Sequence, residues 1–206
     1  DGQLLSRTRN DLKSQITTVT QEYSLRNDMT VLEVMELQGR LYHMKSKQRK
    51  QDAEILLKKC GLWEYRNHKT RQLSGGFKRM LMLCRALLPN PKIVLLDEPT
   101  VGLDPYARRK MWQMIRNLHQ QGLTFILTTH YMEEAVQADR VVVVDKGKKL
   151  LEGTPKEVFK NVDLLKKIGL DVPYMTELAG LLREEGLDID DDILTVDEMV
   201  DKLCQL

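Results

Sequence analysis

Hydrophobic residues occur along this chain in short continuous runs, separated by stretches that are hydrophobic on one side only. The strongest runs lie at 92–98, 123–130 and 140–147, and they are apolar on both faces of an extended strand. This pattern is typical of the central strands of a parallel sheet. A β-branched run at 14–23 predicts a further short strand that ends near Gln21.

The stretches between these runs carry hydrophobic residues at the i, i+3 and i+4 spacing of packed helices. Threonine followed by glutamate three residues later, at 30–33 and again at 195–198, predicts capping boxes at two helix starts. Because strands that alternate with helices imply right-handed crossovers, we predict the α/β class with an open parallel sheet. The other predicted helices lie at 46–61, 77–88, 108–122, 131–138 and 153–159.

Composition is that of an ordinary globular protein, with 206 residues of which 42% are hydrophobic and 30% are charged. The net charge of +2 gives no electrostatic case for a nucleic-acid partner. No apolar run approaches the roughly 20 residues that a membrane-spanning helix needs, so we expect any membrane to be reached through another protein. Cys60, Cys84 and Cys204 stand among apolar neighbours, which predicts buried thiols in a reducing compartment.

The charge is distributed unevenly along the chain. Residues 160–206 contain five Lys or Arg against twelve Asp or Glu, in short helical segments separated by turns marked with Gly or Pro. We predict a domain boundary near residue 160, with a main domain at 1–159 and a small acidic helical appendage after it. The acidic surface is either an ordinary solvated face or a surface for a partner, and composition alone favours the solvated face.

Two of the predicted strands end in side chains that can carry chemistry. One ends in the adjacent carboxylates Asp97 and Glu98, and another ends at His130. Ligands of open α/β sheets bind outside the carboxyl ends of the strands, where one carboxylate could reach magnesium while its neighbour orients a water molecule. Taken singly, an acid pair or a histidine in such a place is more often a turn residue, and Gln21 is a weaker candidate still.

A serine and two glycines, Ser74, Gly75 and Gly76, open the predicted helix at 77–88. A helix N-terminus carries partial positive charge and unpaired N–H groups, and glycines let an oxyanion approach the backbone closely. The junction therefore predicts a phosphate site, whereas ordinary capping by Ser74 would need one glycine at most. The later turn "PTVGLDP" holds Asp104, which by itself indicates only a turn.

In chain order, Gln21, "LSGGFKR", "IVLLDEPTVGLDP" and "TTHYMEEA" resemble the ATP-binding-cassette ATPases, the motor subunits of a large class of membrane transporters. The resemblance runs from about residue 14 to 159, and "LSGG" followed by "LLDEP" is its most specific part. It implies a P-loop NTPase-like parallel sheet and a helical subdomain at about 22–90. The small C-terminal helical appendage at 160–206 is instead similar to the acidic tails of the energy-coupling-factor ATPases, which implies that it pairs ATPase subunits.

The resemblance implies that four residues act around a nucleotide bound in the same subunit. Asp97 would be the Walker B aspartate that holds magnesium, and Glu98 would be the base that polarises the hydrolytic water. Gln21 would contact magnesium and relay to the membrane subunit, and His130 would be the switch histidine at the γ-phosphate. ATP and Mg²⁺ are the implied cofactors, and phosphoryl transfer does require positioning and charge neutralisation.

In this family two cassettes pack head to tail. Ser74, Gly75 and Gly76 would form the signature that touches the γ-phosphate of ATP bound by the other cassette, and Asp104 would be the aspartate of the D-loop. The resemblance therefore implies a second ATPase subunit and a transmembrane subunit as partners. It also implies a peripheral location on the cytoplasmic face of the cell membrane and no nucleic-acid partner.

The phosphate cradle of the family, G-x-x-x-x-G-K-[ST] (Walker A), does not occur in these 206 residues. By chain order it would precede the strand that ends near Gln21, together with another strand of the sheet. We therefore expect the chain to be a piece of a longer protein that lacks its N-terminal strand and P-loop, and to be inactive by itself.

The two ends of the chain resemble different branches of the family. "TTHYMEEA", "LSGGFKR" and residues 25–42 are similar to export-type cassettes for drugs, lipids or polysaccharide. From residue 138 onward the chain resembles the energy-coupling-factor ATPases of vitamin and metal uptake, and we favour uptake because this tail is long and distinctive. The alternatives are an export ATPase, a catalytically silent cassette that supplies the signature in trans, and a soluble cassette that acts on ribosomes or DNA.

Overall fold

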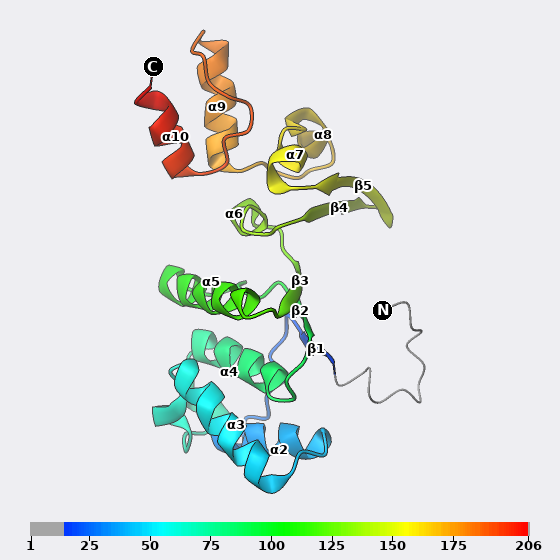
Figure 1. Ribbon diagram of the computed structural model, residues 1–206, viewed down its shortest axis with the longest axis vertical. Helices are drawn as coiled ribbons and strands as arrows, with labels where there is room; N and C mark the ends of the chain where they lie inside the picture. Colours follow the sequence, from blue (N-terminus) through cyan, green and yellow to red (C-terminus); the bar gives the residue numbers. More distant parts are fainter. Residues whose placement is uncertain (1–14, 206) are drawn as a thin grey trace. The chain divides into compact units, whose positions relative to one another are not determined.

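The computed structural model describes residues 15–205, which divide into two compact units. The N-terminal unit ends at Thr128, and the C-terminal unit begins at Thr129 (Figure 1). The predicted boundary between residues 159 and 160 stays a prediction. Each unit has its own hydrophobic core, so the two are described separately.

A parallel sheet forms the centre of the N-terminal unit, with strands in the order β1-β2-β3. The register places Val19 beside Leu96 and Asp97 beside Thr128. Parallel neighbours require long crossovers, and here three helices separate β1 from β2 while one helix separates β2 from β3. The predicted α/β class with a parallel sheet is confirmed. The strands span Ile16–Val19 (β1), Ile93–Asp97 (β2) and Thr124–Thr128 (β3).

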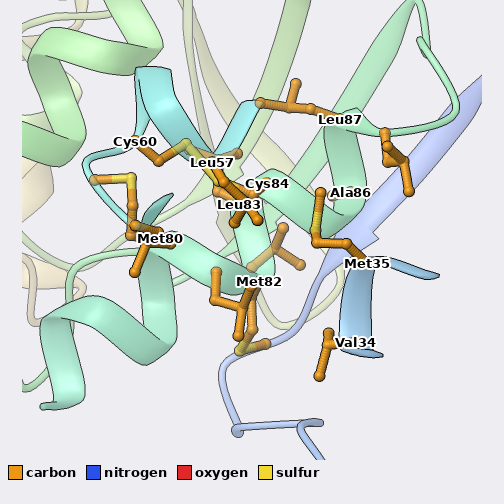
Figure 2. Packing of buried hydrophobic residues seen from close by; sticks show 14 of the residues in the cluster. Val34, Met35, Leu57, Cys60, Met80, Met82, Leu83, Cys84, Ala86 and Leu87 are labelled. Atoms are coloured by element: carbon orange, nitrogen blue, oxygen red, sulfur yellow. A yellow bond between two sulfur atoms is a disulfide. The ribbon is translucent and has the colours of Figure 1, made fainter. Parts of the chain in front are cut away.

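The helices of the N-terminal unit pack around α4, which contacts α2, α3, α5 and β1. Nearly every residue of α4 from Arg79 onward is buried, and Figure 2 shows its side chains meeting those of α2 and α3 in the core. The capping box predicted at Thr30 and Glu33 is present at the start of α2. The helices span Val31–Leu41 (α2), Ser46–Lys59 (α3), Gly75–Leu87 (α4) and Pro105–Gln120 (α5), with 3-10 turns at Trp63–Tyr65 and Thr70–Gln72.

The cysteines are partly as the sequence predicts. Cys60, just after α3, and Cys84, in α4, are both buried in the core of the N-terminal unit. Their sulfur atoms are joined in a disulfide, whereas the sequence predicted free thiols (Figure 2). They meet because the end of α3 packs against α4. Cys204 is an exposed free cysteine, so the prediction that it is buried was wrong.

The C-terminal unit contains a β-hairpin, which corrects one prediction. The run at 140–147 was expected to be a strand of the parallel sheet, but β4 (Val141–Asp145) pairs antiparallel with β5 (Lys148–Gly153). The cause is the turn between them, because Lys146 and Gly147 both have positive φ, as a tight two-residue hairpin turn requires. The short helix α6 (Met132–Ala135) precedes the hairpin.

Four more helices complete the C-terminal unit. The capping box predicted at Thr195 is present at the start of α10, and a further capping box, which was not predicted, is present at Thr154 at the start of α7. One apolar cluster joins the hairpin to α7 and α8, and a second joins α9 to α10. Among residues 15–205, no helix combines the length and apolar character needed to cross a membrane. The helices span Pro155–Phe159 (α7), Val162–Lys167 (α8), Tyr174–Glu184 (α9) and Val196–Leu203 (α10).

Candidate functional site

The carboxyl end of β2 places Asp97 and Glu98 beside the end of β3. The Thr128 hydroxyl donates a hydrogen bond of 2.5 Å to Asp97 Oδ1. The backbone N–H of Glu98 lies 3.2 Å from the same hydroxyl oxygen and 3.1 Å from the Thr128 carbonyl. Thr128 therefore contacts both members of the acid pair: its hydroxyl bonds the Asp97 carboxylate, and its hydroxyl and carbonyl oxygens both face the Glu98 N–H.

Glu98 has a left-handed backbone, with φ of 44°. This conformation is uncommon for a residue with a Cβ atom, and such conformations occur preferentially at functional sites. The chain turns directly after the strand, where the Val101 N–H donates to the Glu98 carbonyl at 3.3 Å. Asp97 is exposed while Glu98 is half-buried.

Gln21 lies two residues after β1, at the same edge of the sheet. Its Nε2 donates a hydrogen bond of 2.8 Å to Glu98 Oε2. Neighbouring parallel strands end at the same edge, so residues 77 positions apart in sequence come together here. Gln21, Asp97 and Glu98, each a weak candidate when taken singly, therefore lie within one small constellation.

The donor set at this edge fits a magnesium ion better than a tightly caged metal. Asp97, Glu98, Gln21 and Thr128 offer only hard oxygen ligands from their side-chain carboxylate, amide and hydroxyl groups, as Mg²⁺ prefers. Within residues 15–205 no group of three His, Cys, Asp or Glu could enclose a metal by itself. Mg²⁺ commonly keeps water and takes one or two carboxylates together with substrate phosphates, so this sparse set is appropriate.

The start of α4 forms the second candidate region. The Ser74 side chain caps the helix by accepting the N–H of Phe77 at 3.3 Å. Ser74 and Gly75 are exposed and Gly76 is half-buried, so this helix start is reachable from outside the unit. The helix is 13 residues long, which provides the aligned N–H groups and dipole that favour an anion.

The two glycines also serve the packing of this unit. A Cβ atom at Gly75 would lie 3.0 Å from the Tyr23 hydroxyl, and one at Gly76 would lie 2.9 Å from the Ala107 Cβ on α5. The close approach of α5 to α4 therefore requires a glycine at position 76. Ordinary capping would not explain either glycine, whereas packing explains both in part.

Asp104 lies beside the start of α4. It caps α5 by accepting the N–H groups of Tyr106 and Ala107, each at 3.0 Å. Asp104, Ser74 and Gly76 line a small cleft of about 140 Å³. The structure thus brings the predicted D-loop aspartate next to the predicted signature within one unit.

His130 lies two residues beyond β3 and belongs to the C-terminal unit. It is exposed, and its ring centroid lies 4.3 Å from that of Tyr131. The preceding residue is fixed, because the Thr129 hydroxyl donates to Glu134 at 2.7 Å. The role of His130 at a γ-phosphate stays a prediction.

Sequence reasoning missed two residues of this region, Thr128 and Arg79. Thr128 precedes His130 in "TTH", and its position at a strand end beside an acid pair was the available signal. Arg79, on α4, is 2% exposed and donates to the carbonyl oxygens of Thr20 and Gln21. Burial lowers the pKa of Arg79, while Tyr23 and Asp97 act in the opposite direction.

Comparison with known proteins agrees with these motifs. The ABC transporter family profile matches residues 1–101, and the profile of the energy-coupling factor transporter EcfA1 C-terminal domain matches residues 173–206. The energy-coupling factor transporter ATP-binding protein EcfA1 of Caldanaerobacter subterraneus subsp. tengcongensis is 52% identical over 154 residues. That match covers 74% of this chain and 56% of the relative.

Two proteins of Clostridioides difficile are also similar. The EcfA1 ATP-binding protein is 51% identical over 155 residues, covering 75% of this chain and 56% of the relative. The EcfA2 ATP-binding protein is 42% identical over 138 residues, covering 66% of this chain and 48% of the relative. The chain thus spans about half the length of the curated relatives it matches.

These relatives carry the energy-coupling-factor name that the C-terminal part of the sequence predicted. The resemblance of residues 25–42 to export-type cassettes is not tested by them and stays a hypothesis. Both family profiles and the relatives name the same class of protein that the motifs at the sheet edge and at the start of α4 resemble. Residues 1–101 thus match the ABC transporter family, and the relatives of the chain are energy-coupling-factor transporter ATP-binding proteins.

Proposed function

We propose that this chain is part of the ATP-hydrolysing motor subunit of an energy-coupling-factor uptake transporter. The observation that carries the proposal is the contact between Gln21 and Glu98 beside Asp97, at the carboxyl edge of a parallel sheet. The EcfA1-like C-terminal segment and the relatives support the uptake branch. We further propose that the chain works within a longer subunit, in which the exposed Ile126 of β3 is covered by another segment.

The residues of the sheet edge have distinct tasks in this proposal. Asp97, held by the Thr128 hydroxyl, is the side chain that would ligate magnesium. Mg²⁺, when bound, neutralises charge on the phosphates of ATP. Glu98 is left to orient and deprotonate the attacking water, and Gln21 fixes the direction of the Glu98 carboxylate through its amide. His130 would add a polar contact to the same phosphate.

The start of α4 serves the other nucleotide site of a pair of cassettes. Ser74, Gly75 and Gly76 would meet phosphate held by a second ATPase subunit, since they are reachable and carry the N–H groups of a helix start. Asp104 would act at the same junction. Closure of the pair on ATP and reopening after hydrolysis would drive the membrane subunits.

The appendage is the proposed contact with the second ATPase subunit. Helix α9 exposes Tyr174, Leu178 and Leu181 at the i, i+4 and i+7 positions, which form one stripe along the helix. Helix α10 exposes a similar stripe, formed by Val196, Val200 and Leu203. Apolar stripes of this kind on acidic helices suit a protein partner. We place the assembled subunit on the cytoplasmic face of the membrane.

The test is ATP turnover by the full-length subunit assembled with its ATPase and membrane partners. Glu98→Gln should abolish hydrolysis at the site that this subunit builds, while nucleotide binding persists. Ser74→Ala should reduce turnover at the partner's site. Loss of turnover with Ser74→Ala but not with Glu98→Gln would instead support a catalytically silent cassette that serves only in trans. Co-purification with ribosomes and without membrane subunits would contradict the transporter assignment.

A further inference from the structure

Arg79 is a buried cation one turn into α4, four residues after Gly75. Its guanidinium donates from Nη1 to the Thr20 carbonyl at 2.6 Å and from Nη2 to the Gln21 carbonyl at 2.7 Å. Its Nε has no hydrogen-bond partner within the described part of the chain. Both terminal nitrogens are therefore directed at the backbone that carries Gln21.

A second contact ties the same segment to the helix start. The guanidinium carbon of Arg79 lies 5.3 Å from the centroid of the Tyr23 ring, a cation–π distance. The Tyr23 hydroxyl donates to the Gly75 carbonyl at 3.3 Å. The backbone after β1 is thus attached to the first turns of α4 at two points, on either side of Glu22.

The arginine adds something that an apolar residue would not. Burial of a guanidinium carries a desolvation cost, and an apolar side chain of similar volume would fill the same place without it. The two carbonyl contacts offset part of this cost and fix the backbone at Thr20 and Gln21, because a planar guanidinium constrains two acceptors at once. The chemistry of the contact therefore favours positioning over simple core filling.

We propose that Arg79 is a positioning residue that holds Gln21 against Glu98 and makes Gln21 move with α4. The inference rests on the proposed ATPase function of this site. A helix moves as a rigid element, so displacement of Ser74–Gly76 by a partner's phosphate reaches Arg79 one turn later. From Arg79 the displacement is transmitted through the Gln21 backbone to the hydrogen bond between Gln21 Nε2 and Glu98 Oε2.

Arg85 supplies a matched control on the same helix. It donates from Nη1 to the Ser24 carbonyl at 2.7 Å and from Nη2 to the Ser24 hydroxyl at 2.6 Å. Its tether therefore ends three residues beyond Gln21. Arg79→Gln and Arg85→Gln remove the same type of side chain from the same helix, but only the first releases Gln21.

The experiment measures ATP hydrolysis by the full-length transporter complex, with the partner's own site silenced. Arg79→Gln should lower kcat roughly 10- to 100-fold, the range expected when a catalytic group is slightly misplaced, with KM for ATP nearly unchanged. Arg79→Lys, which retains the charge and can reach one carbonyl, should lose less. Arg85→Gln should keep kcat within about twofold, because Arg85 contacts Ser24 and its loss leaves the positioning contacts of Gln21 in place.

Two further measurements separate positioning from a general loss of structure. In a double-mutant cycle, Arg79→Gln should have little added effect in the Gln21→Ala background, since the two act through one contact. Without nucleotide, hydrogen exchange at residues 20–23 should accelerate in Arg79→Gln more than in Arg85→Gln. Equal kcat in wild type and both Arg79 variants, or fully additive effects in the cycle, would overturn the inference.

The failure of the proposed function is recognisable separately. Glu98→Gln in the same complex must abolish turnover at this site before the Arg79 variants are interpreted. If it does not, the ATPase assignment fails. If it does, an unchanged kcat or an effect confined to KM in Arg79→Gln refutes the positioning role alone.

Discussion

Helix α4 and the C-terminal helices α9 and α10 are held in place by opposite means. Helix α4 lies in an apolar core and anchors the segment that carries Gln21 through the buried Arg79. Helices α9 and α10 share a small apolar cluster, and several ion pairs near the surface also connect these helices and the loop between them to their surroundings. These pairs are Lys156 with Asp192 and Glu198, Lys160 with Asp191, Lys166 with Glu177, and Lys202 with Asp190.

The difference matches the proposed tasks of the two regions. A group that must orient a water molecule needs a fixed backbone, which close packing and buried hydrogen bonds provide. A surface that docks a partner can be held loosely, because exposed ion pairs contribute little and the partner adds its own contacts. The comparison therefore predicts large, salt-independent effects in the first region and small, salt-dependent effects in the second.

The largest expected effect is a cavity in the core beneath α4. Leu81 is fully buried, so Leu81→Ala should lower the free energy of unfolding by about 2–5 kcal/mol, the usual cost of the lost contacts and cavity. Leu181→Ala on α9, whose side chain is 56% exposed, is the matched control and should change it by less than about 0.5 kcal/mol. Chemical denaturation measures both, and equal losses would remove the contrast.

The second effect concerns Thr128, which holds both acids of the site. Thr128→Val keeps the shape but removes the hydroxyl that donates to Asp97. We expect a stability loss of only about 0.5–1.5 kcal/mol, the usual net contribution of one hydrogen bond, because Asp97 and Thr128 are both exposed and water can replace the lost partner. The fall in kcat of the full-length complex should be larger than the stability loss alone explains. Thr128→Ser, which restores the hydroxyl, should recover most of the activity, and failure of Ser to rescue would contradict this role.

Much of this arrangement could be predicted from the sequence because it depends on local pattern. The strands that end at Asp97 and Thr128 follow from apolar runs, and the cap at Thr30 follows from its spacing to Glu33. The antiparallel partner of β4 was missed because an apolar run does not state its pairing direction.

The tether of Arg79 could not be predicted, since its acceptors are carbonyls 58 and 59 residues earlier in the chain. Side-chain type and spacing carry no signal for a bond to distant backbone. The proximity of Gln21 to Glu98, in contrast, followed once both were assigned to strand ends at one edge of a parallel sheet.

The third effect is the loss of the cap of α10. The Thr195 hydroxyl accepts the Glu198 N–H at 3.3 Å, and the Glu198 carboxylate accepts the Thr195 N–H at 3.2 Å. Thr195→Ala should cost about 1 kcal/mol, the typical value for a lost N-cap. Hydrogen exchange should show faster opening of α10 with no change in the N-terminal unit. Faster exchange in α4 as well would show that the two regions are not independent.

The smallest effect belongs to the ion pairs, and it should depend on pH and salt. Hydrogen bonds to Glu198 and Asp192 raise the pKa of Lys156, and the hydrogen bond from Lys160 lowers that of Asp191. A carboxylate with a depressed pKa stabilises the fold above its unfolded pKa, and that contribution is lost as pH falls through the folded value.

Opening of α10 should therefore become easier as pH falls below about 4, where carboxylates protonate. At neutral pH, Lys156→Met should destabilise the appendage by less than about 1 kcal/mol, since the Lys156 side chain is half exposed, and high salt should remove most of that difference. Hydrogen exchange of α10 in low and high salt measures it. A loss that persists in high salt would mean that Lys156 acts through packing of its aliphatic stem, and the appendage would then resemble the core around α4 more than its charges indicate.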